Sequence, residues 1–185
     1  KKTSFMKSVD AFQDIRKNYN NVNLFSHIYR CLNSPSYRII WLFRVLGGGN
    51  SLISKLLSLY YHRYSRKYLI ELEPETRIGA GIHFPHNGPI VINPKTKIGE
   101  NCIIHPCVLL GGDRKTGAPV IGNNVFIGHG CKLIGKVVIG DYVFIAPGAI
   151  VTKDVYSDYI IGAGINNIIR TTGGRQEVER YSIKL

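Results

Sequence analysis

Histidine is the residue type of this chain best suited to proton transfer, because an imidazole gains and loses a proton near neutral pH. The sequence holds six histidines. His86 is the leading candidate, because it lies in the run Phe84-Pro85-His86-Asn87-Gly88, where two extra residues interrupt a periodic pattern. A side chain in such an insertion can be presented to a cleft. We expect the other five at turn or surface positions or in the N-terminal segment: His27, His62, His83, His105 and His129.

Metal and disulfide chemistry are not indicated by residue spacing. The four cysteines include no C-x-x-C pair, so reduced thiols are the simplest interpretation. No His, Cys and carboxylate spacing resembles a metal site, and we therefore expect no metal. The cysteines are Cys31, Cys102, Cys107 and Cys131.

The segment that must position His86 has a period of six residues. Large apolar residues recur at this step from position 121 to position 151, and a second apolar residue follows each of them after four positions. The same phase holds upstream, apart from an insertion of two residues near Asn87 and one of five near Gly112. A helix needs apolar spacing near 3.6 and tolerates glycine poorly, so a helix is excluded here. The pattern predicts strands stacked into a three-sided coil of a little over four turns between Leu72 and Tyr156. The two apolar sets are Ile121, Ile127, Leu133, Ile139, Ile145 and Val151, and Val125, Cys131, Val137, Val143, Ala149 and Val155.

The first seventy residues differ from the rest in pattern and charge. They hold twelve Lys and Arg against two acids, and their apolar spacing predicts helices around Phe12 to Tyr19, over 39–46 and from Ser51 onward. The helix after Ser51 joins an apolar stripe to basic residues, which suits packing within or between subunits and leaves peripheral membrane contact open. Nothing resembles a nucleic-acid-binding signature, and no apolar run is long enough to span a bilayer. We divide the chain into a helical region (1–70), the coil (71–165) and a C-terminal tail (166–185).

The run Ile121-Gly122-Asn123-Asn124-Val125-Phe126-Ile127-Gly128 resembles the hexapeptide-repeat acyltransferases, in particular serine acetyltransferases and the sugar O-acetyltransferases of surface-polysaccharide pathways. The resemblance covers roughly residues 71–155. It implies a left-handed parallel β-helix, a homotrimer with active sites between subunits, and transfer of an acetyl group from acetyl-coenzyme A to a hydroxyl. A cytoplasmic location, including the inner face of a membrane, would suit this chemistry.

The resemblance also implies roles for individual residues. His86 matches the general base of the family, and Glu71 matches the acid that orients it, with Glu73 as the near alternative. Both acids could equally belong to a solvated acidic edge together with Glu75.

Coenzyme A would lie along the C-terminal coils. In the family, coenzyme A binds along a groove between neighbouring β-helices. The positions of this chain that match the groove are two backbone glycines, a turn and several cations, and His129 replaces a small residue beside them. His129 could touch the pantetheine arm or simply be exposed. The expected contacts are Gly111, Gly112, His129, Ala146, Pro147, Lys153 and Arg170, with Arg175 as a further phosphate ligand.

The acceptor is where the sequence departs from serine acetyltransferases. Pro85 stands where they have Asp, and residues 116–119 read Thr-Gly-Ala-Pro where they have Asp-Arg-His-Pro. We therefore expect a sugar hydroxyl, contacted by Asn87 and Arg114. Serine is the alternative, because Arg114 could replace the missing arginine. A noncatalytic scaffold or a membrane-surface binding protein is the alternative of another class.

Overall fold

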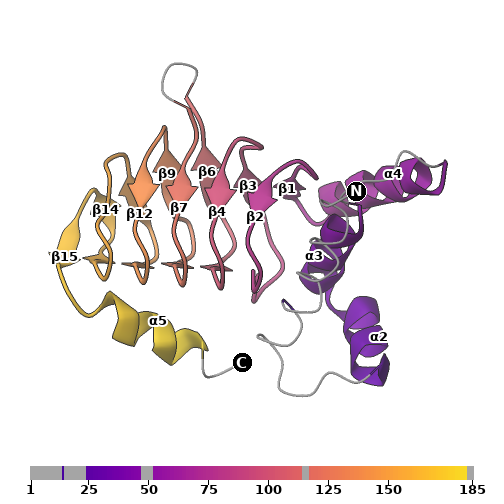
Figure 1. Cartoon of the computed structure of the whole chain (residues 1–185), viewed down its shortest axis with the longest axis horizontal. Helices are drawn as coiled ribbons and strands as arrows, with labels where there is room; N and C mark the ends of the chain where they lie inside the picture. Colours follow the sequence, from indigo (N-terminus) through magenta and orange to yellow (C-terminus); the bar gives the residue numbers. More distant parts are fainter. Residues whose placement is uncertain (1–13, 15–23, 47–51, 114–116, 183–185) are drawn as a thin grey trace.

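A computed structural model describes residues 14, 24–46, 52–113 and 117–182. Figure 1 shows a long stack of strand coils with helices across its N-terminal end and one helix along its side. The chain changes from helix to strand at Ile70.

Within the described ranges, three helices precede the coil: α2 (Leu24–Asn33), α3 (Pro35–Val45) and α4 (Leu52–Lys67). The Ser34 side chain caps α3 by accepting a hydrogen bond from the amide of Tyr37, and Pro35 occupies the first turn, where a missing N–H costs nothing. Ile39 and Phe43 of α3 are fully buried against the coil. The helical prediction is confirmed for these segments, whereas its part around Phe12 to Tyr19 lies, apart from Asp14, outside the described residues.

The strands form three parallel sheets, one for each side of the coil. Sheet A has the order β1-β3-β6-β9-β12-β14, sheet B the order β2-β4-β7-β10, and sheet C the order β5-β8-β11-β13-β15, in which β13 and β15 alone pair antiparallel. The strands are β1 (Ile70–Leu72), β2 (Arg77–Ile78), β3 (Ile90–Ile92), β4 (Lys97–Ile98), β5 (Ile103–Ile104), β6 (Val108–Gly111), β7 (Val120–Ile121), β8 (Phe126–Ile127), β9 (Lys132–Ile134), β10 (Val138–Ile139), β11 (Phe144–Ile145), β12 (Ala149–Val151), β13 (Ile160–Ile161), β14 (Gly164–Ile165) and β15 (Ile168–Arg170).

The residues of the six-residue period line the inside of this coil. Every member of both apolar sets from position 121 to position 155 is buried, and Ile127, Leu133 and Ile145 have no exposed surface. Cys102 and Cys131 take core positions as well. Burying one such aliphatic side chain stabilises the fold by about 1.5–3 kcal/mol, so the coil is held by many equivalent contributions.

Glycine follows the large apolar residue because successive coils approach closely there. A Cβ on Gly99 would lie 2.5 Å from the carbonyl oxygen of Gly122, and one on Gly140 would lie 2.4 Å from the amide nitrogen of Ser157. A larger residue at either place would push neighbouring coils apart.

The C-terminal segment, which we predicted to be a tail, contains β15 and a helix, α5 (Gly174–Ser182). Val178 of α5 is buried against Ile103 and Phe126, which point outward from sheet C, and Tyr181 lies over the ring of Phe126 with 4.5 Å between ring centroids. The outer face of sheet C is therefore covered by the chain itself.

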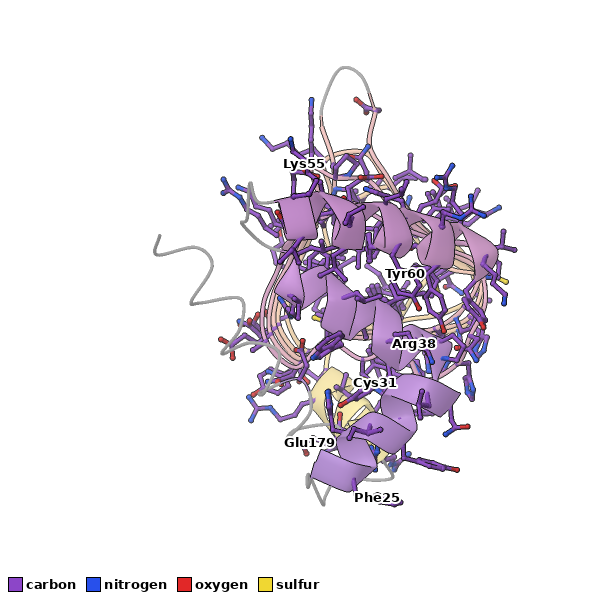
Figure 2. The ribbon with its side chains drawn as sticks, turned by 90° about the vertical axis from the view of Figure 1, so that its right-hand side faces the viewer. Phe25, Cys31, Arg38, Lys55, Tyr60 and Glu179 are labelled. Carbon is purple, nitrogen blue, oxygen red and sulfur yellow. The ribbon has the colours of Figure 1, made fainter. Side chains whose placement is uncertain are left out.

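The helical end of the molecule leaves apolar side chains on its surface. Figure 2 looks onto this end and shows Lys55 and Tyr60 on α4 and Phe25 on α2. Among the described residues, no helix has the length and apolar character needed to cross a membrane.

Candidate active site

Three histidines meet at one corner of the coil, the corner between sheets C and A. Ile104 pairs with Ile127, and His83 bridges to Ile103. Phe84, Ile104 and Ile127 therefore occupy equivalent positions on three successive coils and are stacked on one another. His86, His105 and His129 follow these residues by one or two positions. The stacking of coils thus brings together side chains that are nineteen and twenty-four residues apart in sequence.

The three imidazole rings are close neighbours. Ring centroids are 5.7 Å apart for His86 and His105, 5.8 Å for His86 and His129, and 4.4 Å for His105 and His129. One ring nitrogen from each can be chosen so that all three lie within 4.8 Å of one another. We name these residues the histidine corner.

The rings of the histidine corner differ in burial. His86 and His129 are exposed, whereas His105 is half-buried and its ring lies tilted against that of Phe126, with 4.9 Å between ring centroids. Burial, together with the smaller effect of the neighbouring charges of His129 and His86, lowers the pKa of His105 to about 4, so this ring is neutral at pH 7. In the described part of the chain, no hydrogen bond engages a ring nitrogen of His86, and Nδ1 of His105 is buried without a partner.

His83 is buried, which corrects the expectation of a surface position. It bridges to Ile103, whose side chain points outward from sheet C, so His83 lies on the outer face of that sheet and is covered there. Burial lowers its pKa to about 4, with smaller contributions from His105 and His86. The period places His83 on the outer face of its coil, between the core residues Ile82 and Phe84, and it does not indicate that this position is covered in the folded chain.

Glu71 lies on β1 and is exposed. With His62, Arg66 and Glu73 it lines a pocket of about 290 Å³ between α4 and β1. Within the described ranges, no hydrogen bond or ion pair joins Glu71 or Glu73 to His86. Orientation of His86 by either acid stays a prediction.

Asn87 has a structural partner. Its Oδ1 accepts hydrogen bonds from the amide and the hydroxyl of Ser36, at 3.1 and 3.0 Å, and so ties the first turn of α3 to the insertion that carries His86. The side-chain oxygen is therefore engaged with α3, and substrate contact by Asn87 stays a prediction. Arg114 lies outside the described residues.

The chain has relatives of known activity. Residues 118–153 match the family model described as bacterial transferase hexapeptide (six repeats). Serine acetyltransferase from Synechococcus elongatus is 35% identical over 109 residues, which are 57% of this chain and 45% of that protein. Serine acetyltransferase from Helicobacter pylori is 37% identical over 89 residues, 46% of this chain and 52% of that protein.

Solved structures of similar fold extend the match to the helices. Soybean serine acetyltransferase complexed with serine has a TM-score of 0.72 at 26% identity and covers 89% of this chain and 70% of that one. This chain resembles the hexapeptide-repeat serine acetyltransferases. The predicted left-handed parallel β-helix with an N-terminal helical region is confirmed. The chain spans about half the length of the curated relatives it matches.

Part of the predicted coenzyme A track lies at the histidine corner. Ile145 pairs with Ile127, which sets Ala146 and Pro147 one coil beyond His129, and the amide of Gly148 donates to the carbonyl of His129 at 2.8 Å. Three of the expected contacts thus line up with His86 along a single corner.

The other expected contacts lie elsewhere on the coil. Gly111 ends strand β6, Gly112 follows it, and Lys153 follows β12, at the opposite edge of sheet A. Arg170 is exposed on β15, and Arg175 lies with its guanidinium 3.9 Å from the centroid of the Tyr142 ring. Whether coenzyme A reaches these groups stays a prediction.

Proposed function

We propose that this protein is an acetyl-coenzyme A-dependent O-acetyltransferase that uses His86 as general base and L-serine as its hydroxyl acceptor. One observation carries the proposal: His86 is exposed at the corner that also holds His129, Ala146 and Pro147, and no described group engages its ring nitrogens. A ring nitrogen without a partner is available to accept a proton.

The reaction needs one proton acceptor and one site for negative charge. His86 takes the proton of the acceptor hydroxyl as that oxygen attacks the thioester carbonyl. The C–S bond then breaks, the acetyl ester forms, and the proton passes from the imidazolium to the leaving thiolate. Backbone amides of the coil corner would hydrogen-bond the tetrahedral oxyanion, a contribution of about 3 kcal/mol when well aligned.

Serine is the favoured acceptor because of the relatives. Both curated proteins described above are serine acetyltransferases, and the soybean structure was solved with serine. The serine acetyltransferase from Brucella abortus, at 23% identity and a TM-score of 0.68, was solved with coenzyme A. Our expectation of a sugar acceptor has no support from these comparisons. It rested on Pro85 and on Thr116-Gly117-Ala118, where the sequence departs from serine acetyltransferases.

Thiol release from acetyl-coenzyme A, measured across a panel of acceptors, tests this function. We expect release with L-serine and ester formation detected by mass spectrometry. L-alanine is the matched control, because it lacks only the hydroxyl. Release with sugar hydroxyls and none with serine would overturn the choice of acceptor, and no release with any acceptor would overturn the enzymatic function.

The proposed function also bears on the oligomeric state of the protein and on its location. A single chain leaves His86 and His129 on its surface, and a second copy packed beside this corner would shield the reaction from water. We therefore propose a homotrimer located in the cytoplasm. Light scattering on the purified protein tests the assembly, and a monomeric mass would contradict it.

A further inference from the structure

The histidine corner has the composition of a metal site as well as of a proton-transfer site. His86, His105 and His129 offer three imidazole nitrogens within 4.8 Å of one another, each from a different coil of a rigid stack. Neutral imidazole is the commonest protein ligand of transition metals, and three such ligands with one open position are typical of zinc.

The distances allow these rings to close on one ion. Nitrogens that share a tetrahedral zinc ion lie about 3.3 Å apart, because each Zn–N bond is about 2.0–2.1 Å long. Side-chain rotation by His86 and His129 must therefore bring the nitrogens closer by about 1.5 Å at most. Both rings are exposed and have room for this rotation.

The residues around the histidine corner leave its ring nitrogens available to a metal ion. In the described portion, no acidic side chain is hydrogen-bonded to any of the three rings, and Nδ1 of His105 is buried without a partner. Three cationic imidazoles so close together would repel one another, whereas three neutral ones can share one cation. We propose that His86, His105 and His129 bind one divalent transition-metal ion, with Zn²⁺ as the best match.

Metal binding would also regulate the activity proposed above, and this consequence rests on that proposed function. A nitrogen of His86 that coordinates a metal has no lone pair left to accept the proton of a hydroxyl. Zn²⁺ and the acceptor proton therefore compete for the same atom. The ion would inhibit acetyl transfer reversibly, and a chelator would restore it.

Binding is tested on the full chain without reference to activity. Protein stripped with a chelator is titrated with Co²⁺, whose visible absorption reports three-nitrogen tetrahedral coordination, and then with Zn²⁺ by calorimetry. We expect one ion per chain. His105→Ala and His129→Ala should each weaken Zn²⁺ binding by at least about tenfold, since even outer-shell partners of metal ligands contribute about 10- to 100-fold.

His62→Ala is the matched control, because His62 lies on α4 in the pocket with Glu71, outside the histidine corner. The affinity of His62→Ala for Zn²⁺ should equal that of the unmodified protein. Absence of tetrahedral Co²⁺ absorption, or equal binding by His105→Ala and the unmodified protein, would overturn the metal site.

Inhibition is measured separately, with each variant's rate normalised to its own metal-free rate. We expect the Zn²⁺ concentration for half inhibition to rise at least about tenfold in His105→Ala, in step with its lost affinity. If the metal-free protein transfers no acetyl group to any acceptor, the proposed function fails while the Co²⁺ titration still decides the metal site. If transfer is active and insensitive to bound Zn²⁺, the regulatory consequence is wrong.

Discussion

Arg44 and Asp14 form an ion pair in which Nε of the guanidinium lies 2.7 Å from Oδ2 of the carboxylate, and both side chains are almost completely buried. The same guanidinium donates to the carbonyls of Ile78 and Gly79 at 2.7 and 2.6 Å, and the carboxylate accepts from the amides of Gly81 and Ile82. Burial raises the pKa of Asp14, and Arg44 and the two amides oppose this rise. The pair therefore fastens the N-terminal helices to the first coil.

Replacing Arg44 by alanine should reduce the free energy of unfolding by about 3–5 kcal/mol, because the change leaves the Asp14 carboxylate and two carbonyls buried without their partner. Urea denaturation followed by circular dichroism measures this loss. Arg63→Ala, an exposed arginine on α4, should change stability by no more than about 0.5 kcal/mol. A loss below about 1 kcal/mol for Arg44→Ala would show that the buried pair does not hold the helices in place.

The cysteines should differ sharply in reactivity towards a thiol reagent. Burial raises the pKa of Cys102 to about 12 and that of Cys131 to about 11, whereas Cys107 is exposed. Because the thiolate is the reacting form, Cys107 should be modified first at pH 8, and Cys102 and Cys131 only after unfolding. Peptide mass spectrometry over a time course identifies the modified residues. Cys107→Ser should remove the fast phase, and rapid labelling of Cys131 in folded protein would contradict its place in the core.

Helix α4 joins exposed apolar side chains to a purely basic charge. Leu52, Ile53, Leu56 and Leu59 are 60–77% exposed, and the helix carries Lys and Arg but no acid. Such a face suits an anionic bilayer surface, where apolar burial and attraction to headgroups add.

We predict that the protein sediments with vesicles containing phosphatidylserine, more weakly at high salt, and less with phosphatidylcholine alone. Leu56→Glu should weaken sedimentation, whereas Ile165→Glu, an equally charged change at an exposed apolar residue of β14, should not. Equal recovery in the supernatant with and without anionic vesicles would mean that α4 packs against another copy or another protein.

The coil could be predicted from sequence because its signal is local and repeated. Each six-residue unit places Ile, Leu or Val inside the coil, as Ile127, Leu133 and Ile145 show, and successive units repeat the same apolar pattern. The close approach at Gly99 follows from the same repetition, because every coil passes its neighbour at one fixed distance.

The histidine corner could not be predicted in the same way. His105 meets His86 and His129 because of the register between coils, and the insertions at positions 85–88 and 112–117 hide that register from a count of residues. The period places His105 one residue, and His129 two residues, after its core position, so nothing in sequence shows that their rings converge.

The packing of the helical region was also difficult to predict, because it depends on contacts between residues far apart in sequence. The bond of Asn87 to Ser36 and the pair of Arg44 with Asp14 join segments that lie 51 and 30 residues apart. No periodicity records such contacts, since each depends on how a helix packs against the end of the coil. Asn87 was expected at the substrate, which stays a prediction, and no periodicity indicated that its oxygen would accept hydrogen bonds from Ser36 in the first turn of α3.

The exchange of His86 for alanine tests the central claim most directly. With L-serine as acceptor and metal-free protein, thiol release by His86→Ala should fall by about 10²- to 10⁴-fold, the usual contribution of a general base. Its thermal unfolding and its mass in solution should match those of the unmodified protein, because the replaced ring is exposed, and His62→Ala should retain full activity. Retention of more than about a tenth of the original rate by His86→Ala would contradict the assignment of His86 as the base.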